Sequence, residues 1–168
     1  WLGIWVVVAT IPAGLIGLLI KDQVEAAFSS PLATGIFLLV TAALLFLAEI
    51  LGKRTRDLEQ MNWLDAVGVG FAQALAIFPG VSRSGATISA GMLRSLKRPA
   101  AARFSFLMSI PVFAAAAVLS ISDLADIPNL SGFLPVLVAG FLAAAVIGYL
   151  SIRWLLAFIS KHSFKGFA

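Results

Sequence analysis

The chain has 168 residues, of which 61% are hydrophobic and only 12% are charged, and its net charge is +4. The charged fraction is far below the roughly 25% of soluble domains, and a soluble protein of this length has too small a core to bury so much apolar surface. The composition therefore excludes a soluble globular protein and predicts an all-α integral membrane protein. Basic residues of membrane proteins mark cytoplasmic loops, so we expect no nucleic acid partner. The absence of cysteine excludes disulfides and cysteine-ligated metals.

Four apolar segments are long enough to cross about 30 Å of hydrocarbon. They run over residues 1–20, 32–51, 104–122 and 133–152. A short charged loop, ending at Pro31, separates the first two, and Glu49 in the second span is expected at the headgroup interface. Since the chain starts inside an apolar run, we expect residues 1–168 to form one membrane domain, the C-terminal portion of a longer protein.

The apolar segment 66–93 differs from the four spans because it carries a charge, Arg83, near its middle. One helix over these residues would be about 42 Å long, which exceeds an untilted span. Pro79-Gly80 interrupts it, because proline removes a backbone donor and glycine permits a turn. The pattern predicts a re-entrant hairpin over 66–95, made of two half-helices of about 18–20 Å each.

The distribution of basic residues favours this hairpin. The loops at 53–60, 94–103 and 153–165 carry three, four and three Lys or Arg, whereas 122–132 carries none and contains Asp123 and Asp126. If 66–93 enters and leaves by one face, all three basic loops lie on one side, as the positive-inside rule requires. The single histidine, His162, lies in the last basic loop and is expected to be solvated or at headgroup level.

Arg83 lies in a short polar motif that suits an anion. An arginine in the middle of a span costs about 2.5–3.5 kcal/mol, so it needs a partner or a wet cavity. The first N–H groups of the second half-helix and its dipole favour a phosphate, and the guanidinium can bind oxygens bidentately. Thr87 lies one turn further along the same face, Ser82 or Ser84 can cap the helix or bond the ligand, and Gly85 permits close approach.

Structural readings of the same residues stay open at this point. A Pro-Gly kink with serine caps would need no ligand if Arg83 paired with Glu49 or Asp65. Small residues at every fourth position from Ser82 also suit close helix packing. Gln73, the polar residue of the first half-helix, either forms an interhelical hydrogen bond or lines the cavity.

Residues 71–93 read FAQALAIFPGVSRSGATISAGML and contain the pattern Pro-Gly-x-Ser-Arg-Ser-x-x-Thr. This segment closely resembles the second signature of the bacterial undecaprenyl-diphosphate phosphatases, the bacitracin-resistance membrane protein family. The resemblance extends through 37–49 and 101–111 and covers essentially the whole chain. It implies a multi-pass enzyme of the bacterial plasma membrane that removes one phosphate from the C55 isoprenyl diphosphate, giving the carrier lipid for peptidoglycan. It also implies two inverted repeats, each holding a re-entrant helix pair.

The resemblance assigns roles by position. It implies catalytic roles for Arg83, Ser82 and Thr87, and substrate binding by Ser84, Gly85, Gly80 and Gln73. The first signature of the family, a glutamate-rich segment followed by Pro-Val-Ser-Ser-Thr-Gly-His, is absent here. Because that signature supplies the acidic residues tied to a divalent cation, Mg²⁺ or Ca²⁺, we expect no metal ligands in this chain. We also expect these 168 residues to hold the phosphate-binding half of the site and to be inactive alone.

A transporter or flippase for a polyprenyl phosphate or another anion is the alternative. Broken half-helices near mid-membrane are also found in transporters. The hydroxyl cluster around Arg83 favours phosphate chemistry, whereas ion coupling favours an intramembrane carboxylate.

Overall fold

The computed structural model describes residues 1–124 and 130–166, so that Asp126 of the acidic linker lies outside the described residues. The described chain is helical, which confirms the predicted all-α class, and four helices are long and apolar enough to cross a membrane. The helices are α1 (Leu2–Leu19), α2 (Lys21–Phe28), α3 (Pro31–Leu51), α4 (Trp63–Leu75), α5 (Arg83–Leu93), α6 (Arg98–Leu124) and α7 (Leu130–Lys161), with 3-10 turns η1 (Leu58–Gln60) and η2 (Phe164–Gly166).

The boundaries of α1 and α3 agree with the predicted spans, but two basic segments predicted as loops are helical. The helix α6 begins at Arg98 rather than at 104, and α7 continues to Lys161 rather than ending at 152. Lysine and arginine are good helix formers, and their long side chains reach the headgroup region from the last turns of a span. The predicted loop after the first span also contains a helix, α2, in which Lys21 and Glu25 form an ion pair of 3.6 Å.

The segment predicted as a re-entrant hairpin contains two short helices, α4 and α5, joined by a turn. Asn62 begins α4 through a capping box with Asp65. In the turn, Gly80 has φ of +89°, and a Cβ atom there would lie 2.3 Å from the carbonyl oxygen of Thr34 in α3. Only glycine combines this conformation with so close an approach. The tip of the hairpin is therefore packed tightly against α3.

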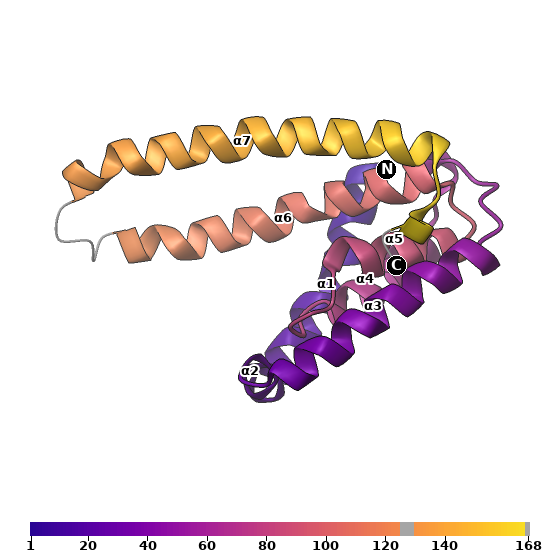
Figure 1. The fold of residues 1–168 in the computed structure, drawn as a ribbon, viewed down its shortest axis with the longest axis horizontal. Coiled ribbons are helices and arrows are strands. Elements are labelled where there is room, and N and C mark those ends of the chain that lie inside the picture. Colours follow the sequence, from indigo (N-terminus) through magenta and orange to yellow (C-terminus); the bar gives the residue numbers. More distant parts are fainter. Residues whose placement is uncertain (125–129, 167–168) are drawn as a thin grey trace.

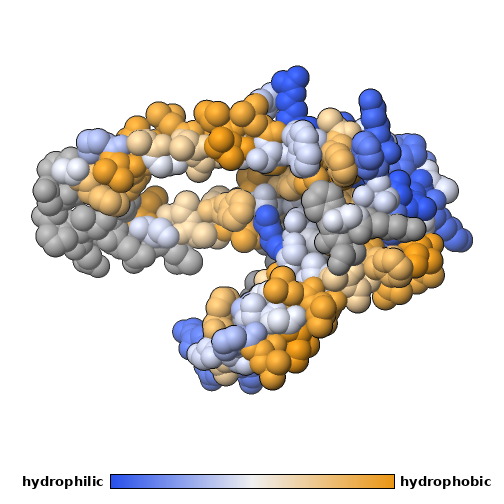
Figure 2. Space-filling model, in the orientation of Figure 1, coloured by the Kyte–Doolittle hydropathy of each residue, from blue (hydrophilic) through white to orange (hydrophobic). Residues whose placement is uncertain are grey.

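Both ends of the hairpin lie on the same side of the molecule. The N–H groups of Thr55 and Arg56 each donate to the carbonyl of Ser95 at 2.9 Å, and the N–H of Lys97 donates to Arg56 at 2.9 Å. The loops before α4 and after α5 are thus adjacent, and α4 and α5 lie side by side among α1, α3 and α6 (Figure 1). The N–H of Phe164, beyond α7, donates to Glu49 at the end of α3. The three basic segments therefore share one face, where hydrophilic residues gather in Figure 2.

The apolar core lies close to this basic face. Its largest fully buried apolar side chains come from α4, α5, the loop between α5 and α6, the first part of α6 and the end of α7. They are, in chain order, Val69, Met92, Leu96, Phe104, Met108 and Ile159. The far parts of α6 and α7 extend beyond this core (Figure 1) and expose large apolar side chains, as helices solvated by lipid do.

Candidate functional site

Two polar side chains of the hairpin face one cavity. Arg83 is the first residue of α5, and Gln73 lies in the last turn of α4. Both line a cavity of about 330 Å³ between α1, α4 and α6. The remaining lining residues are small or apolar apart from one hydroxyl: Thr10, Ala13, Gly14, Ala76, Ile77, Pro111, Val112 and Ala115.

One guanidinium nitrogen of Arg83 and the side-chain amide of Gln73 are buried without partners in the part of the chain that the structure describes. Within the described residues, Nη1 of Arg83 and both amide atoms of Gln73 make no hydrogen bond. The guanidinium carbon of Arg83 lies 4.9 Å from the ring centroid of Phe113 in α6, over its face. Buried polar groups are nearly always paired, and each one left unsatisfied costs about 1–3 kcal/mol. An arrangement that collects such atoms around one cavity suits a ligand rich in oxygen atoms.

The carboxylates considered as partners of Arg83 bind other arginines. Glu49 accepts two hydrogen bonds of 2.6 Å from Arg98 and one of 2.8 Å from Arg54. Glu49, which we expect at the headgroup interface, lies in the last turn of α3 and is only 4% exposed. The reading in which Arg83 pairs with Glu49 is therefore wrong.

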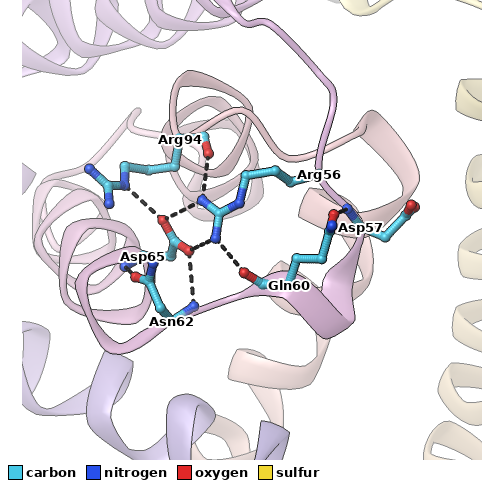
Figure 3. A network of polar contacts seen from close by, with 6 residues as sticks. All are labelled: Arg56, Asp57, Gln60, Asn62, Asp65 and Arg94. Carbon is cyan, nitrogen blue, oxygen red and sulfur yellow. Dashed lines mark hydrogen bonds and ion pairs between the residues drawn. The ribbon is translucent and has the colours of Figure 1, made fainter.

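Asp65 is also enclosed by arginines of the basic segments (Figure 3). It is fully buried and binds Arg56 at 2.7 Å and Arg94 at 2.8 Å, and it accepts the N–H of Asn62 at 3.0 Å. Burial raises the pKa of Asp65, but the hydrogen bonds from Arg56, Asn62 and Arg94 outweigh it and hold the pKa below its usual value. Asp65 thus links the two ends of the hairpin through its ion pairs. It does not pair with Arg83, whose side chain lines the cavity.

The two serines of the motif face a different cavity. Ser82 and Ser84, with Gly85, line a space of about 470 Å³ beside α3 and α7. The Ser82 hydroxyl caps α5 by accepting the N–H of Gly85 at 3.1 Å, and the N–H of Ser82 donates to the Thr41 hydroxyl at 3.0 Å. Because Arg83 lines the cavity of about 330 Å³ and its serine neighbours line this one, their side chains point to different sides of the start of α5. The sequence places these side chains next to each other, but the helix separates them.

Thr87 and the glycines of the motif have packing roles in this structure. The Thr87 hydroxyl is buried, donates to the carbonyl of Arg83 at 2.8 Å and lies 2.7 Å from the hydroxyl of Ser105 in α6. It joins α5 to α6 and lines neither cavity. A Cβ atom on Gly85 would lie 2.7 Å from the Thr41 methyl, so this glycine permits contact with α3. Gly80, described above, shapes the tip of the hairpin.

Two residues that bear on the polarity of this site, Thr10 and Phe113, were not predicted. Thr10 of α1 lines the cavity, and Phe113 of α6 lies under the guanidinium. Both occur in helices that are apolar on every side, where periodicity does not distinguish an inner from an outer face. No local motif marks them.

The cavity lies at the end of the hairpin that is remote from the basic face. The helix α5 has eleven residues and runs from Arg83 to a C-cap at Arg94, beside the basic loops. At 1.5 Å per residue, this places Arg83 about 16 Å from that end. Thus Arg83 is deep in the bundle, separated from the basic face by the length of α5.

The described donor set does not fit a divalent cation. Mg²⁺ and Ca²⁺ require several oxygen ligands, usually including carboxylates. In residues 1–124 and 130–166, no three His, Asp or Glu side chains gather, and neither Asp, Glu nor His lines the cavity with Arg83. The guanidinium itself repels a cation. The residues that this cavity offers are suited to bind anions.

Comparison with known proteins places these features in one family. The sequence model described as "Bacitracin resistance protein BacA" matches residues 1–168. A relative from Methanothermobacter thermautotrophicus is 48% identical over 97% of this chain and 91% of its own length. Relatives from Mycolicibacterium gilvum and Rubrobacter xylanophilus are 43% and 47% identical over nearly the whole chain, which spans about 60% of their lengths. All three are named undecaprenyl-diphosphatase.

Proposed function

The chain belongs to the bacitracin resistance protein BacA family, and we propose that it is a membrane-embedded phosphatase that converts undecaprenyl diphosphate to the monophosphate. One observation carries this proposal. Nη1 of Arg83 and the amide of Gln73, buried and without partners among the described residues, line the same cavity within the hairpin bundle. A diphosphate carries negative charge and acceptor oxygen atoms, and these would provide the missing partners of both groups.

In the proposed reaction, Arg83 binds the phosphoryl oxygens and stabilises the charge that develops on them. Charge stabilisation and positioning account for most of the catalysis in phosphoryl transfer. The Phe113 ring covers one face of the guanidinium, which leaves its edge for bidentate contact with phosphate. The amide nitrogen of Gln73 donates to a further oxygen, and the N-terminal dipole of α5 adds to the attraction. The apolar walls lower the local dielectric and strengthen all of these interactions.

The residues that activate the nucleophile are proposed to lie outside this set. The described lining of the cavity supplies neither a carboxylate nor an imidazole as a base, and an unassisted hydroxyl is a weak nucleophile. That these 168 residues are inactive alone stays a prediction. The Methanothermobacter protein is the most useful one to assay beside this chain, because the chain covers 91% of its length.

The depth of the cavity supports a proposal for its orientation. Basic segments of membrane proteins lie on the cytoplasmic side, and Arg83 is remote from them. We therefore propose that the protein lies in the plasma membrane and receives the diphosphate from the opposite side. Its product would be the monophosphate carrier lipid used for wall polymers such as peptidoglycan.

The test is phosphate release from farnesyl and undecaprenyl diphosphate in detergent, measured for this chain and for the Methanothermobacter relative. Arg83→Ala, or alanine at the aligned position if the relative is the protein that turns over, should abolish hydrolysis. Arg103→Ala, which replaces an exposed arginine of α6 in this chain, should not. Translocation of a labelled polyprenyl phosphate across vesicles is measured in parallel. Loss of translocation with hydrolysis intact would overturn the phosphatase and support the transporter. Turnover by the chain itself would overturn the expected inactivity.

A further inference from the structure

A third cavity, with basic walls, lies at the basic face, at the end of the hairpin that is remote from Arg83. It has a volume of about 460 Å³ and is formed where α3 ends, α6 begins and α7 ends. Its walls include four cationic side chains, namely Lys53, Arg54, Lys97 and Arg98, together with Pro99, Ile159 and Ser160. The reaction proposed above uses none of these residues.

The two arginines of this cavity are held in place by one buried carboxylate. The side chain of Glu49 is 1% exposed, and its two oxygens bind Nε and Nη2 of Arg98, Nη1 of Arg54 and the N–H of Phe164. A guanidinium carries five N–H donors, so both arginines keep further donors that the carboxylate does not use. Arg54 also has φ of +53°, which non-glycine residues rarely adopt. The two guanidinium groups of the cavity are thus held in place by Glu49.

The cavity keeps an excess of positive charge. In the described part of the chain, Glu49 is the carboxylate that pairs with Arg54 and Arg98, and Asp57 pairs with Lys97 at 2.6 Å. Lys53 is exposed and makes no ion pair among the described residues. Two carboxylates therefore face four cations, and the remaining charge, with the N-terminal dipole of α6 beside it, attracts an anion.

The position of the cavity indicates the source of that anion. It lies at the ends of three candidate membrane spans, so the bilayer places it at the level of the lipid headgroups. Basic cavities between membrane helices on the cytoplasmic side bind phosphate-bearing headgroups. We propose that this cavity binds the phosphate of an anionic phospholipid from the basic face of the membrane. The proposal does not depend on the phosphatase activity.

The experiment is a titration of the detergent-purified chain with phosphatidylglycerol, phosphatidylcholine or inorganic phosphate, with bound lipid counted by native mass spectrometry and the melting temperature followed. We expect phosphatidylglycerol to bind and stabilise the protein, and the other two to have little effect. Lys53→Gln should weaken binding about fivefold and Lys53→Gln with Lys97→Gln about 25-fold. Lys21→Gln, an exposed lysine of α2, is the matched control and should change nothing. Neither lysine supports the core, so these variants should fold.

Each contrary result overturns the proposal. Equal binding of phosphatidylglycerol and phosphatidylcholine would show that the cavity does not select a charged headgroup. Equal loss in the Lys21 and Lys53 variants would show that only the net charge matters. If inorganic phosphate raises the melting temperature at concentrations at which phosphatidylglycerol has no effect, the cavity binds a soluble anion and not a lipid. Binding to Arg83 is excluded as the cause if Arg83→Ala leaves the titration unchanged.

Discussion

Replacing Gln73 by methionine should stabilise the protein and weaken its binding of a diphosphate. Both amide atoms of Gln73 are buried without a hydrogen bond within the described residues. An amide buried in this way costs about 1–3 kcal/mol in proteins. Methionine is unbranched, of similar length and adapts to irregular spaces. Gln73→Met should therefore raise the free energy of unfolding in detergent by about 1–3 kcal/mol.

The same substitution removes a donor to a charged oxygen. Hydrogen bonds to charged groups contribute about 1.5–3 kcal/mol, which corresponds to a loss of affinity of about 10- to 150-fold. The assay is calorimetric titration of the chain with a farnesyl methylenediphosphonate, an analogue that cannot be hydrolysed at the bridging position. It reports on binding whether or not the chain turns over.

Ser89→Ala is the matched control for this prediction. The Ser89 hydroxyl is also buried without a partner in the described structure, but it lies away from the cavity of Arg83. Its removal should stabilise the protein and leave the affinity unchanged. The reasoning is refuted if Gln73→Met destabilises the protein, or if it binds the analogue as tightly as the parent chain does.

Three further outcomes are expected. Arg83→Lys keeps the charge but loses the planar fork, so the affinity for the same analogue should fall about 10- to 100-fold, whereas Arg103→Lys on the surface of α6 should bind normally. The pKa of Asp65 is lowered in the folded protein below the unfolded value of about 3.9, so its contribution to stability should be complete at neutral pH and lost as the pH falls below about 4. Asp65→Asn should cost about 1–3 kcal/mol, because the two arginines that it releases are partly exposed, and should flatten that acid dependence in thermal unfolding. Gly80→Ala should lower the melting temperature more than Ala72→Gly does, because a Cβ atom at Gly80 would lie 2.3 Å from a carbonyl oxygen at a φ of +89°; equal effects would contradict the tight packing of the turn.

Local features of the sequence were enough to predict the all-α class and the order of the candidate spans along the chain. Hydropathy over about twenty residues marks a span, and the Pro79-Gly80 break together with the basic segments predicts a hairpin with both ends on one face. The motif around Arg83 also made it possible to recognise the family. Hydropathy, helix breaks and charged segments are all read over short stretches of sequence. They can be interpreted without the tertiary structure, because the contact of each stretch with lipid or water determines them.

Only the tertiary structure decided which side chains meet. Ser82, Ser84 and Thr87 adjoin Arg83 in the motif, yet the rotation of α5 directs them to a second cavity and to α6. Gln73, ten positions before Arg83 in the sequence, lines the same cavity because the hairpin folds back. Helices that are apolar on all sides carry no periodic pattern that would predict their rotation, so Thr10 and Phe113 could not be found. Glu49 and Asp65 pair with arginines that are distant in the sequence, Arg98 at the start of α6 and Arg94 at the end of α5. These long-range ion pairs leave Arg83 available to bind an anion.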